Sequence, residues 1–194
     1  MKALVIYESM YGNTRSIATA VAEGLRAHGE AIAVPVAEAD PGLVATADVV
    51  VVGGPTHAHG MSHAATRKSA ETAALKPDTT LKVERGASGP GLREWFATLG
   101  TLTATAAAFD TRLHGPSALT GRASKGISRA LHRHGATLIA EPHSFLVNKN
   151  NQLEPGQKAS ARAWGDHIGA NAAAGTTLAP RLTVSSATIA GPPA

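Results

Sequence analysis

Ala3-Leu4-Val5-Ile6-Tyr7 and, one residue later, Ser9-Met10-Tyr11-Gly12-Asn13-Thr14 form the stretch that decides the fold of this chain. The first segment is a short continuous apolar run, which is typical of a strand buried on both faces of a parallel sheet. The second segment is a polar loop that contains a glycine. Apolar residues then recur at every fourth position and share one face of a helix that we expect over residues 14–28. Strand, loop and helix in this order predict the first β-α unit of an α/β protein.

Strand and helix signals continue to alternate after this unit. We expect further strands at residues 31–36, 49–52, 103–109 and 136–140, with residues 144–147 extending the last of them. We expect helices over residues 63–75, 92–99, 119–134 and around 161–168, and a loop over residues 76–90. This alternation predicts one α/β domain over residues 1–173, built on a parallel sheet with helices on both faces. Residues 174–194 contain mainly small residues, threonine, serine and proline, and we expect a flexible C-terminal tail there.

The composition narrows the class of protein. The chain has 194 residues, of which 43% are hydrophobic, as expected for one globular domain with a sizeable core. No apolar run approaches the roughly 20 residues that a membrane span needs, so we expect none. The chain contains no cysteine, which excludes disulfides, thiolate metal sites and cysteine nucleophiles. This fits a reducing compartment, and we expect a cytoplasmic location.

The charge is positive but thinly spread. The formal net charge is +4 at pH 7, and positive charge favours anionic partners. The densest group of cationic residues has the spacing of a solvated helix face and consists of Arg122, Lys125, Arg129 and Arg133. No phenylalanine, tyrosine or tryptophan is interleaved with them. We therefore expect no nucleic-acid partner.

The polar loop Ser9–Thr14 lies where parallel sheets bind ligands, beyond the carboxyl end of a strand. The first N–H groups of the following helix have no partner within the helix, and the helix dipole adds partial positive charge there. A phosphate group fits such a helix N-terminus without a cationic side chain. Gly12 lets the backbone approach the anion, and hydroxyl or amide groups surround it on Ser9, Tyr11, Asn13 and Thr14. The alternative interpretation is an ordinary helix capped by serine or asparagine after a tight turn.

The pattern Val5-Ile6-Tyr7-x-Ser9-x-x-Gly12-x-Thr14, followed by Ala18 and Val21, resembles the signature of the flavodoxin family. In that family this loop binds the phosphate of FMN. The pattern has neither the glycines of a dinucleotide-binding fold nor the Gly-Lys-Ser/Thr of a P-loop. The resemblance implies a flavodoxin-like, doubly wound sandwich with a five-stranded parallel sheet in the order 2-1-3-4-5. It also implies that FMN is the cofactor and that the whole loop binds it, namely Ser9, Met10, Tyr11, Gly12, Asn13 and Thr14.

The third predicted strand runs into the loop Gly53-Gly54-Pro55-Thr56-His57-Ala58-His59-Gly60. In flavodoxin-like proteins the loop at this place lies against the isoalloxazine ring, so the resemblance assigns Pro55, Thr56 and His57 to cofactor binding. Many flavodoxins stack a tryptophan or tyrosine on the ring, whereas this loop offers histidines and Met61. The alternative is a plain strand–helix connection, for which Gly-Gly-Pro is a general turn signal.

The loop after the fourth predicted strand is assigned by the same resemblance to the other ring face and the pyrimidine edge. The residues assigned there to cofactor binding are Asp110, Thr111 and Arg112, and the arginine would stabilise reduced, anionic flavin. The alternative is an Asp110–Arg112 pair that only holds the loop. The motif His57-x-His59-x3-His63 invites a metal site, but it lacks cysteine and a nearby carboxylate, so we expect no metal.

Three functions follow from these observations, and the sequence leaves the choice between them open. The resemblance implies an FMN-binding protein that acts in electron transfer with redox partner proteins. A related alternative is an FMN-dependent NAD(P)H:quinone-type oxidoreductase, because a ring face without a stacking aromatic leaves room for a small redox substrate. The third is a non-redox binding module on the same scaffold, since a fold does not fix a function. Typical flavodoxins are acidic, whereas this chain is basic, which favours an acidic partner or an anionic substrate.

Overall fold

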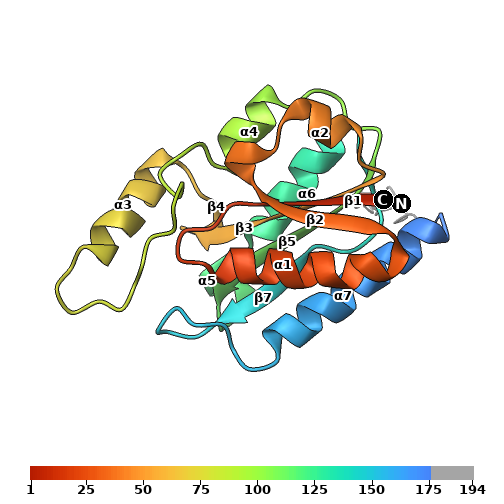
Figure 1. The fold of residues 1–194 in the computed structure, drawn as a ribbon. Helices are drawn as coiled ribbons and strands as arrows, with labels where there is room; N and C mark the ends of the chain where they lie inside the picture. Colours follow the sequence, from red (N-terminus) through yellow and green to blue (C-terminus); the bar gives the residue numbers. More distant parts are fainter. Residues whose placement is uncertain (176–194) are drawn as a thin grey trace, which may run out of the picture.

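Residues 1–175 are described by a computed structural model, which is a three-layer α/β sandwich around a parallel sheet (Figure 1). The strands of this sheet are β1 (Lys2–Tyr7), β2 (Glu30–Pro35), β3 (Val49–His57), β5 (Thr105–Leu113), β6 (Thr137–Leu138) and β7 (His143–Val147). They stand in the order β2-β1-β3-β5-β6, and β7 also pairs with β5. The tail predicted over residues 174–194 lies outside the described residues except at its first two positions.

The predicted order 2-1-3-4-5 is confirmed, with one difference at the fifth position. Two short strands share that position. The first, β6, pairs with the start of β5 through Thr105 and Thr137, whereas β7 pairs with its end from Phe109 and His143 onward. Pro142 lies between the two strands and has no N–H to donate to the ladder, which explains why the pairing is interrupted there.

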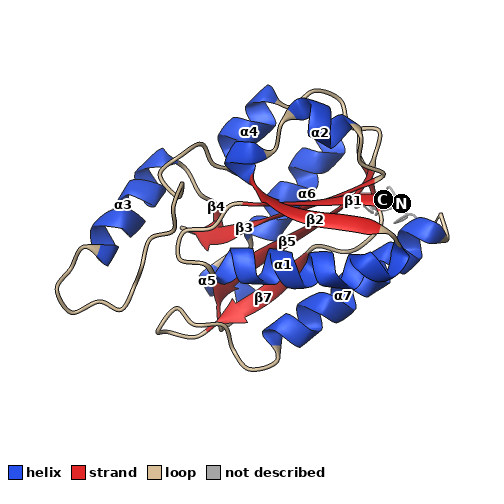
Figure 2. Cartoon of the chain, viewed as in Figure 1, coloured by secondary structure: helices blue, strands red, loops and turns tan. Residues whose placement is uncertain are grey.

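Helices cover both faces of the sheet (Figure 2). On one face lie α1 (Asn13–Leu25) and α7 (Gln157–Ala173), and on the other lie α2 (Pro41–Ala45), α4 (Leu92–Thr98) and α6 (Ala123–Arg133). The short elements are the 3₁₀ turns η1 (Arg26–His28) and η2 (Val36–Glu38) and the helix α5 (Ser117–Thr120), which takes up the start of the helix predicted over residues 119–134. The helix predicted over residues 63–75 is confirmed as α3 (Ala64–Ala74), and it projects away from the sandwich in Figure 1. Within residues 1–175, no helix has the length and apolar character needed to cross a membrane.

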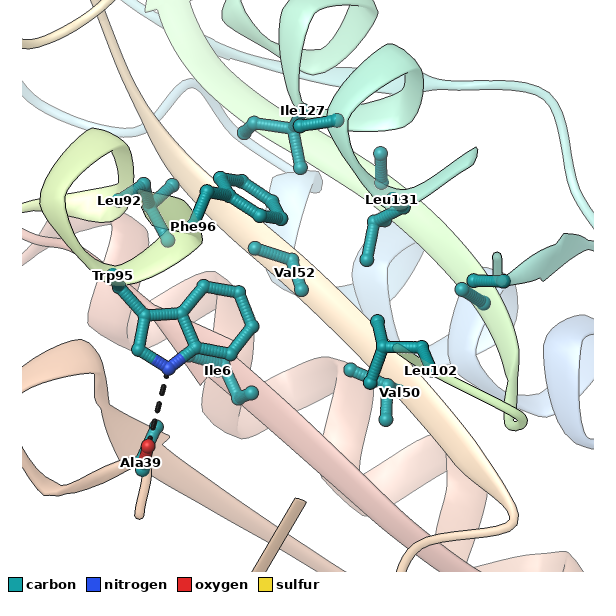
Figure 3. Packing of buried hydrophobic residues seen from close by; sticks show 14 of the residues in the cluster. Ile6, Ala39, Val50, Val52, Leu92, Trp95, Phe96, Leu102, Ile127 and Leu131 are labelled. Atoms are coloured by element: carbon teal, nitrogen blue, oxygen red, sulfur yellow. Dashed lines mark hydrogen bonds between the residues drawn. The ribbon is translucent and has the colours of Figure 1, made fainter. Parts of the chain in front are cut away.

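The core has one layer on each side of the sheet. The valines of β3, Val49–Val52, are fully buried and point alternately into the two layers. In the layer under α4 and α6, Trp95 packs near Ile6, and its indole N–H donates to the carbonyl oxygen of Ala39 at 3.1 Å (Figure 3). The central alanines of β5 are buried between both layers. Burial and pairing with β3 therefore outweigh the poor strand propensity of alanine.

The backbones of α1 and α7 approach closely because each helix presents a glycine to the backbone of the other. A Cβ atom on Gly24 would lie 2.0 Å from the carbonyl oxygen of Arg162, and one on Gly165 would lie 2.2 Å from that of Val21. Only glycine permits this approach of the two backbones. Because the loop Ser9–Thr14 leads directly into α1, this packing fixes the position of the loop.

Candidate cofactor site at the carboxyl edge of the sheet

The loop between β1 and α1 ends in a left-handed glycine. Gly12 has φ +91° and is the N-cap residue of α1, where no side chain caps the helix. The Ser9 hydroxyl accepts the N–H of Gly12 at 3.1 Å and keeps its own proton for donation. The first turn of α1 therefore lacks the serine or asparagine cap that the alternative interpretation requires. Its N–H groups remain directed out of the helix end, as anion binding needs.

Two side chains of the loop are already bonded to other parts of the protein. The Tyr11 hydroxyl donates to the carbonyl oxygen of Ala70 in α3 at 2.7 Å. The Asn13 amide donates to the carbonyl oxygen of Asn151 at 2.8 Å. These bonds fix the loop between α3 and the segment that follows β7. They also leave the backbone N–H groups and Ser9 as the main donors for an anion.

The remaining loop residues are buried. The Thr14 hydroxyl lies 2.8 Å from that of Thr111, so the loop is joined to the end of β5. Met10 is fully enclosed, and its carbonyl oxygen accepts the N–H of Glu84 at 2.9 Å. Of the predicted cofactor residues, Thr14 at the start of α1 and Thr111 near the end of β5 are thus brought together from distant parts of the sequence.

A carboxylate of the chain lies over this loop. Glu84 Oε1 is 2.5 Å from Arg15 Nε, and a Cβ atom on Gly12 would lie 3.6 Å from the same oxygen. The position above Gly12 therefore already accepts a negatively charged oxygen beside a guanidinium. This is the property that a phosphate site requires, so the residues at this end of the site fit the phosphate of FMN.

A cavity of about 770 Å³ adjoins the loop. Its walls are the ends of β1 and β2, the turn η2 and the segment 82–90 that carries Glu84. Tyr7 lies in this wall, where burial raises the pKa of its phenol and the nearby charge of Glu84 raises it further. The cavity is large enough for a small-molecule ligand of a few hundred Å³.

The loop after β3 forms a hairpin that was not predicted from the sequence. The residues Ala58 and His59 have φ of 44° and 71°, which makes a tight turn into the antiparallel strand β4 (Gly60–Met61). The hairpin packs on Gly121, where a Cβ atom would lie 2.1 Å from the Cα atom of His59. The N–H of Arg122 donates to the His59 carbonyl oxygen at 3.3 Å. The loops after β3 and β5, which the resemblance assigns to opposite faces of a flavin ring, are therefore in direct contact.

Two of the predicted cofactor residues cap helix α6. The N–H of Ala123 donates to Thr56 Oγ1 at 3.0 Å, and the N–H of Ser124 donates to Asp110 Oδ2 at 2.8 Å. Asp110 is fully buried, so its carboxylate contacts the helix end and not the solvent. Carboxylates and hydroxyls at a helix N-terminus satisfy N–H groups that have no partner inside the helix. Any effect of these two residues on a ligand would be transmitted through α6.

Arg112 holds the loop after β5, but not through Asp110. Its Nη1 donates to the carbonyl oxygen of Gly115 and to the Thr120 hydroxyl, both at 2.8 Å. Within residues 1–175, the ion pairs found do not include one between Arg112 and Asp110. The loop-holding role is thus carried by carbonyl and hydroxyl acceptors and not by the Asp110 carboxylate.

Pro55 and His57 lie on the part of β3 that extends beyond the predicted strand. Burial lowers the pKa of His57 below its ordinary value, and the positive charge of Arg67 lowers it further, while the carboxylate of Glu8 opposes both. A histidine in these surroundings is neutral near pH 7 and so has a ring nitrogen free to accept a proton. Within residues 1–175, no group of three or more His, Asp or Glu side chains is placed to hold a metal ion.

A buried network of charged side chains beside the loop was missed by the sequence reasoning. Glu8 follows β1 directly, accepts the N–H of Leu92 at 2.9 Å and accepts the Ser62 hydroxyl. Arg67 of α3 donates to the Ser62 hydroxyl and to Glu94, both at 3.1 Å. The only signal for it in the sequence is a glutamate at the end of a buried strand. This network anchors α3 and the segment 62–92 to the sheet.

The comparisons with known proteins agree with this architecture. A flavodoxin from the domain Archaea is 18% identical, with 89% of this chain and 99% of that chain covered at a TM-score of 0.59. Oxidised flavodoxin 1 from Bacillus cereus is 16% identical, with coverages of 87% and 97% and a TM-score of 0.58. A flavodoxin, WrbA-like protein from Agrobacterium tumefaciens is 20% identical, with coverages of 89% and 98% and a TM-score of 0.57. At these identities the structures establish the fold alone.

The sequence comparison extends this result from fold to family. A search among curated proteins found no match to the chain. The family model described as Flavodoxin matches residues 5–115, a span that begins in β1 and runs past β5, and it includes the uncapped loop at Gly12. The chain belongs to the flavodoxin family.

Proposed function

We propose that this protein binds FMN, with the phosphate on the loop Ser9–Thr14, and acts in electron transfer. The observation that carries the proposal is the uncapped N-terminus of α1 at Gly12, over which the Glu84 carboxylate already lies. The isoalloxazine of bound FMN would supply one- or two-electron redox chemistry. The protein would contribute the position of the cofactor and the charges around it.

The phosphate would be held by backbone N–H groups and by the Ser9 hydroxyl, with Arg15 as the neighbouring cation. Thr111 would act by holding Thr14 in place, while Tyr11 and Asn13 would fix the loop through their bonds to other segments. Met10 would support the loop from the core. At the ring end, the hairpin contacts Gly121 directly. There we propose Pro55 and His57 as direct contacts, and we propose that Thr56, Asp110 and Arg112 act through the loops that they hold.

The direct test is a titration of the purified, cofactor-free chain with FMN, in which the quenching of flavin fluorescence measures binding. Saturable quenching with a dissociation constant below about 10 μM would support the proposal. A chain that leaves FMN fluorescence unchanged at these concentrations would contradict it. Steady-state oxidation of NADPH in the presence of a quinone then separates the oxidoreductase alternative from a carrier, since a carrier turns over only with a partner protein.

Glu84→Gln is expected to tighten FMN binding about five- to tenfold, because the substitution removes a negative charge that competes with the phosphate at Gly12 and frees Arg15. The backbone bond from residue 84 to Met10 remains, so the segment keeps its position. Glu38→Gln is the matched control, because Glu38 lines the same cavity without an ion pair to Arg15. The measurement is the same FMN titration at low ionic strength. Unchanged or weaker affinity in Glu84→Gln would show that the phosphate and Glu84 do not share a position.

A further inference from the structure

A second concave site lies between the β3–β4 hairpin, α4 and α6. It is a groove of about 610 Å³. Its cationic and titratable side chains come from the hairpin, from α4, and from α6 with its N-cap residue: His59, Arg93, Arg122, Arg129, His132 and Arg133. We call it the arginine groove. Among the described residues, those that line the groove include no aspartate or glutamate. Its remaining surface includes the apolar side chains of Met61 and Leu138.

Two of the arginines are held in place by the backbone of neighbouring segments. Arg93 donates through Nε to the carbonyl oxygen of Ser62 at 2.9 Å and through Nη2 to that of Met61 at 3.2 Å. Arg122 donates through Nε to the Ser144 hydroxyl at 3.2 Å and through Nη2 to the carbonyl oxygen of Pro142. Each guanidinium has five N–H donors, so these bonds orient the group and still leave N–H donors available for a ligand. Ordered guanidinium groups lose less conformational entropy when they bind a ligand.

The other two arginines, Arg129 and Arg133, lie on one side of α6 in a row of positively charged side chains. Lys125, Arg129 and Arg133 are spaced four residues apart, and like charges at this spacing repel each other along a helix. The sequence pattern alone indicates a solvated helix face, but Arg129 and Arg133 line the groove together with arginines from other elements. Within residues 1–175, the ion pairs found involve none of the four groove arginines. A bound anion would relieve this repulsion.

We propose that the arginine groove binds the pyrophosphate group of a nucleotide, a site distinct from the FMN phosphate loop. Guanidinium groups bind phosphate oxygens in bidentate pairs, and several converge here in one concave space. The groove has the volume of a small-molecule site, whereas a partner protein needs a larger and flatter surface. Met61 and Leu138 provide the apolar contact that a nucleoside would use. This proposal stands without FMN binding, because no groove residue belongs to the loop Ser9–Thr14.

The test is isothermal titration calorimetry of the full chain with ADP, inorganic pyrophosphate and adenosine. We expect ADP to bind more tightly than pyrophosphate and adenosine not to bind. The variant Arg129→Gln/Arg133→Gln should weaken ADP binding by at least about tenfold. The control Lys158→Gln/Arg162→Gln removes the same charge from α7 on the opposite face and should stay within about twofold of the unmodified chain. Both pairs include side chains at the surface, so the variants should fold, which circular dichroism checks.

Several outcomes would overturn the proposal. The first is no heat of ADP binding at about 1 mM nucleotide. The second is equal weakening in both charge variants, which would indicate general electrostatic attraction. The third is loss of ADP binding in Gly12→Val, which would assign the phosphate to the loop and not to the groove. The fourth is binding of poly-glutamate as tight as that of ADP at equal ionic strength, which would identify the groove as a docking surface for an acidic protein.

Discussion

Arg67→Met is expected to lower the free energy of unfolding by about 3–5 kcal/mol, because it removes one partner from a buried network of charges. Arg67 is 6% exposed and links the Ser62 hydroxyl to Glu94. A Cβ atom on Gly91 would approach both the Arg67 guanidinium and the Glu8 carboxylate, so the two charges lie close together. Without the guanidinium, the buried Glu8 side chain is left with fewer compensating groups.

The measurement is urea unfolding followed by far-UV circular dichroism, with Lys68→Met as the matched control. Lys68 is the next residue of α3, is exposed, and contacts Glu71 at 3.6 Å. An exposed ion pair of this kind contributes little to stability, so we expect Lys68→Met to change the free energy of unfolding by no more than about 0.5 kcal/mol. The double variant Glu8→Gln/Arg67→Met should recover part of the stability lost in Arg67→Met. A loss below about 1 kcal/mol in Arg67→Met would mean that the network does not anchor α3.

The loss of unfolding free energy in Arg67→Met should depend on pH, because Arg67 hydrogen-bonds Glu94. Burial alone would raise the pKa of Glu94, but the hydrogen bonds from Arg67 and from the N–H of Gly91 lower it below its ordinary value overall. A carboxyl with a lowered folded-state pKa adds stability above its unfolded pKa, and this contribution is lost as the pH falls through the folded-state pKa. The difference in the free energy of unfolding between the unmodified chain and Arg67→Met should therefore become smaller at acidic pH.

The central strands β1 and β3 could be predicted because burial on both faces leaves a local signature. The runs in β1 and β3 are continuous and apolar, and each is followed by turn residues. The end of β3 could not be placed, because the tight turn at Ala58 and His59 uses residues that are uncommon at positive φ and is supported by contact with Gly121. The contact joins segments that are distant in the sequence, and a local pattern does not record it.

The candidate site divides in the same way between local and distant interactions. The uncapped loop at Gly12 could be predicted, since its properties follow from a glycine before a helix. The Glu84 carboxylate above it could not, because it comes from a segment without periodic pattern. Asn13 and Asn151 are 138 residues apart, and Thr14 and Thr111 are 97 apart. The resemblance assigns Thr56 and Asp110 to cofactor binding, and only the structure brings the N-terminus of α6 to them.

Gly12→Val is expected to weaken FMN binding at least about a hundredfold, which corresponds to about 2.7 kcal/mol. A β-branched residue at φ +91° is strained by an amount on the order of 1–3 kcal/mol, so the loop would change conformation to avoid it. The valine side chain would also point toward the Glu84 carboxylate and the Arg15 guanidinium, the space in which we propose that the phosphate lies. Both effects act on the N–H groups at the start of α1, and neither reaches the ring end of the site.

Gly156→Val is the control that separates strain from loss of the anion site. Gly156 is the N-cap residue of α7, has φ +81° and also lacks a side-chain cap, but a Cβ atom there meets no atom within 4 Å. The two variants should therefore lose similar amounts of stability in urea unfolding, because they impose the same backbone strain at the same helix position. Only Gly12→Val should lose FMN binding. Equal FMN affinity in the two variants would exclude the loop Ser9–Thr14 as the phosphate site, because no other difference between the two helix ends would then bear on the cofactor.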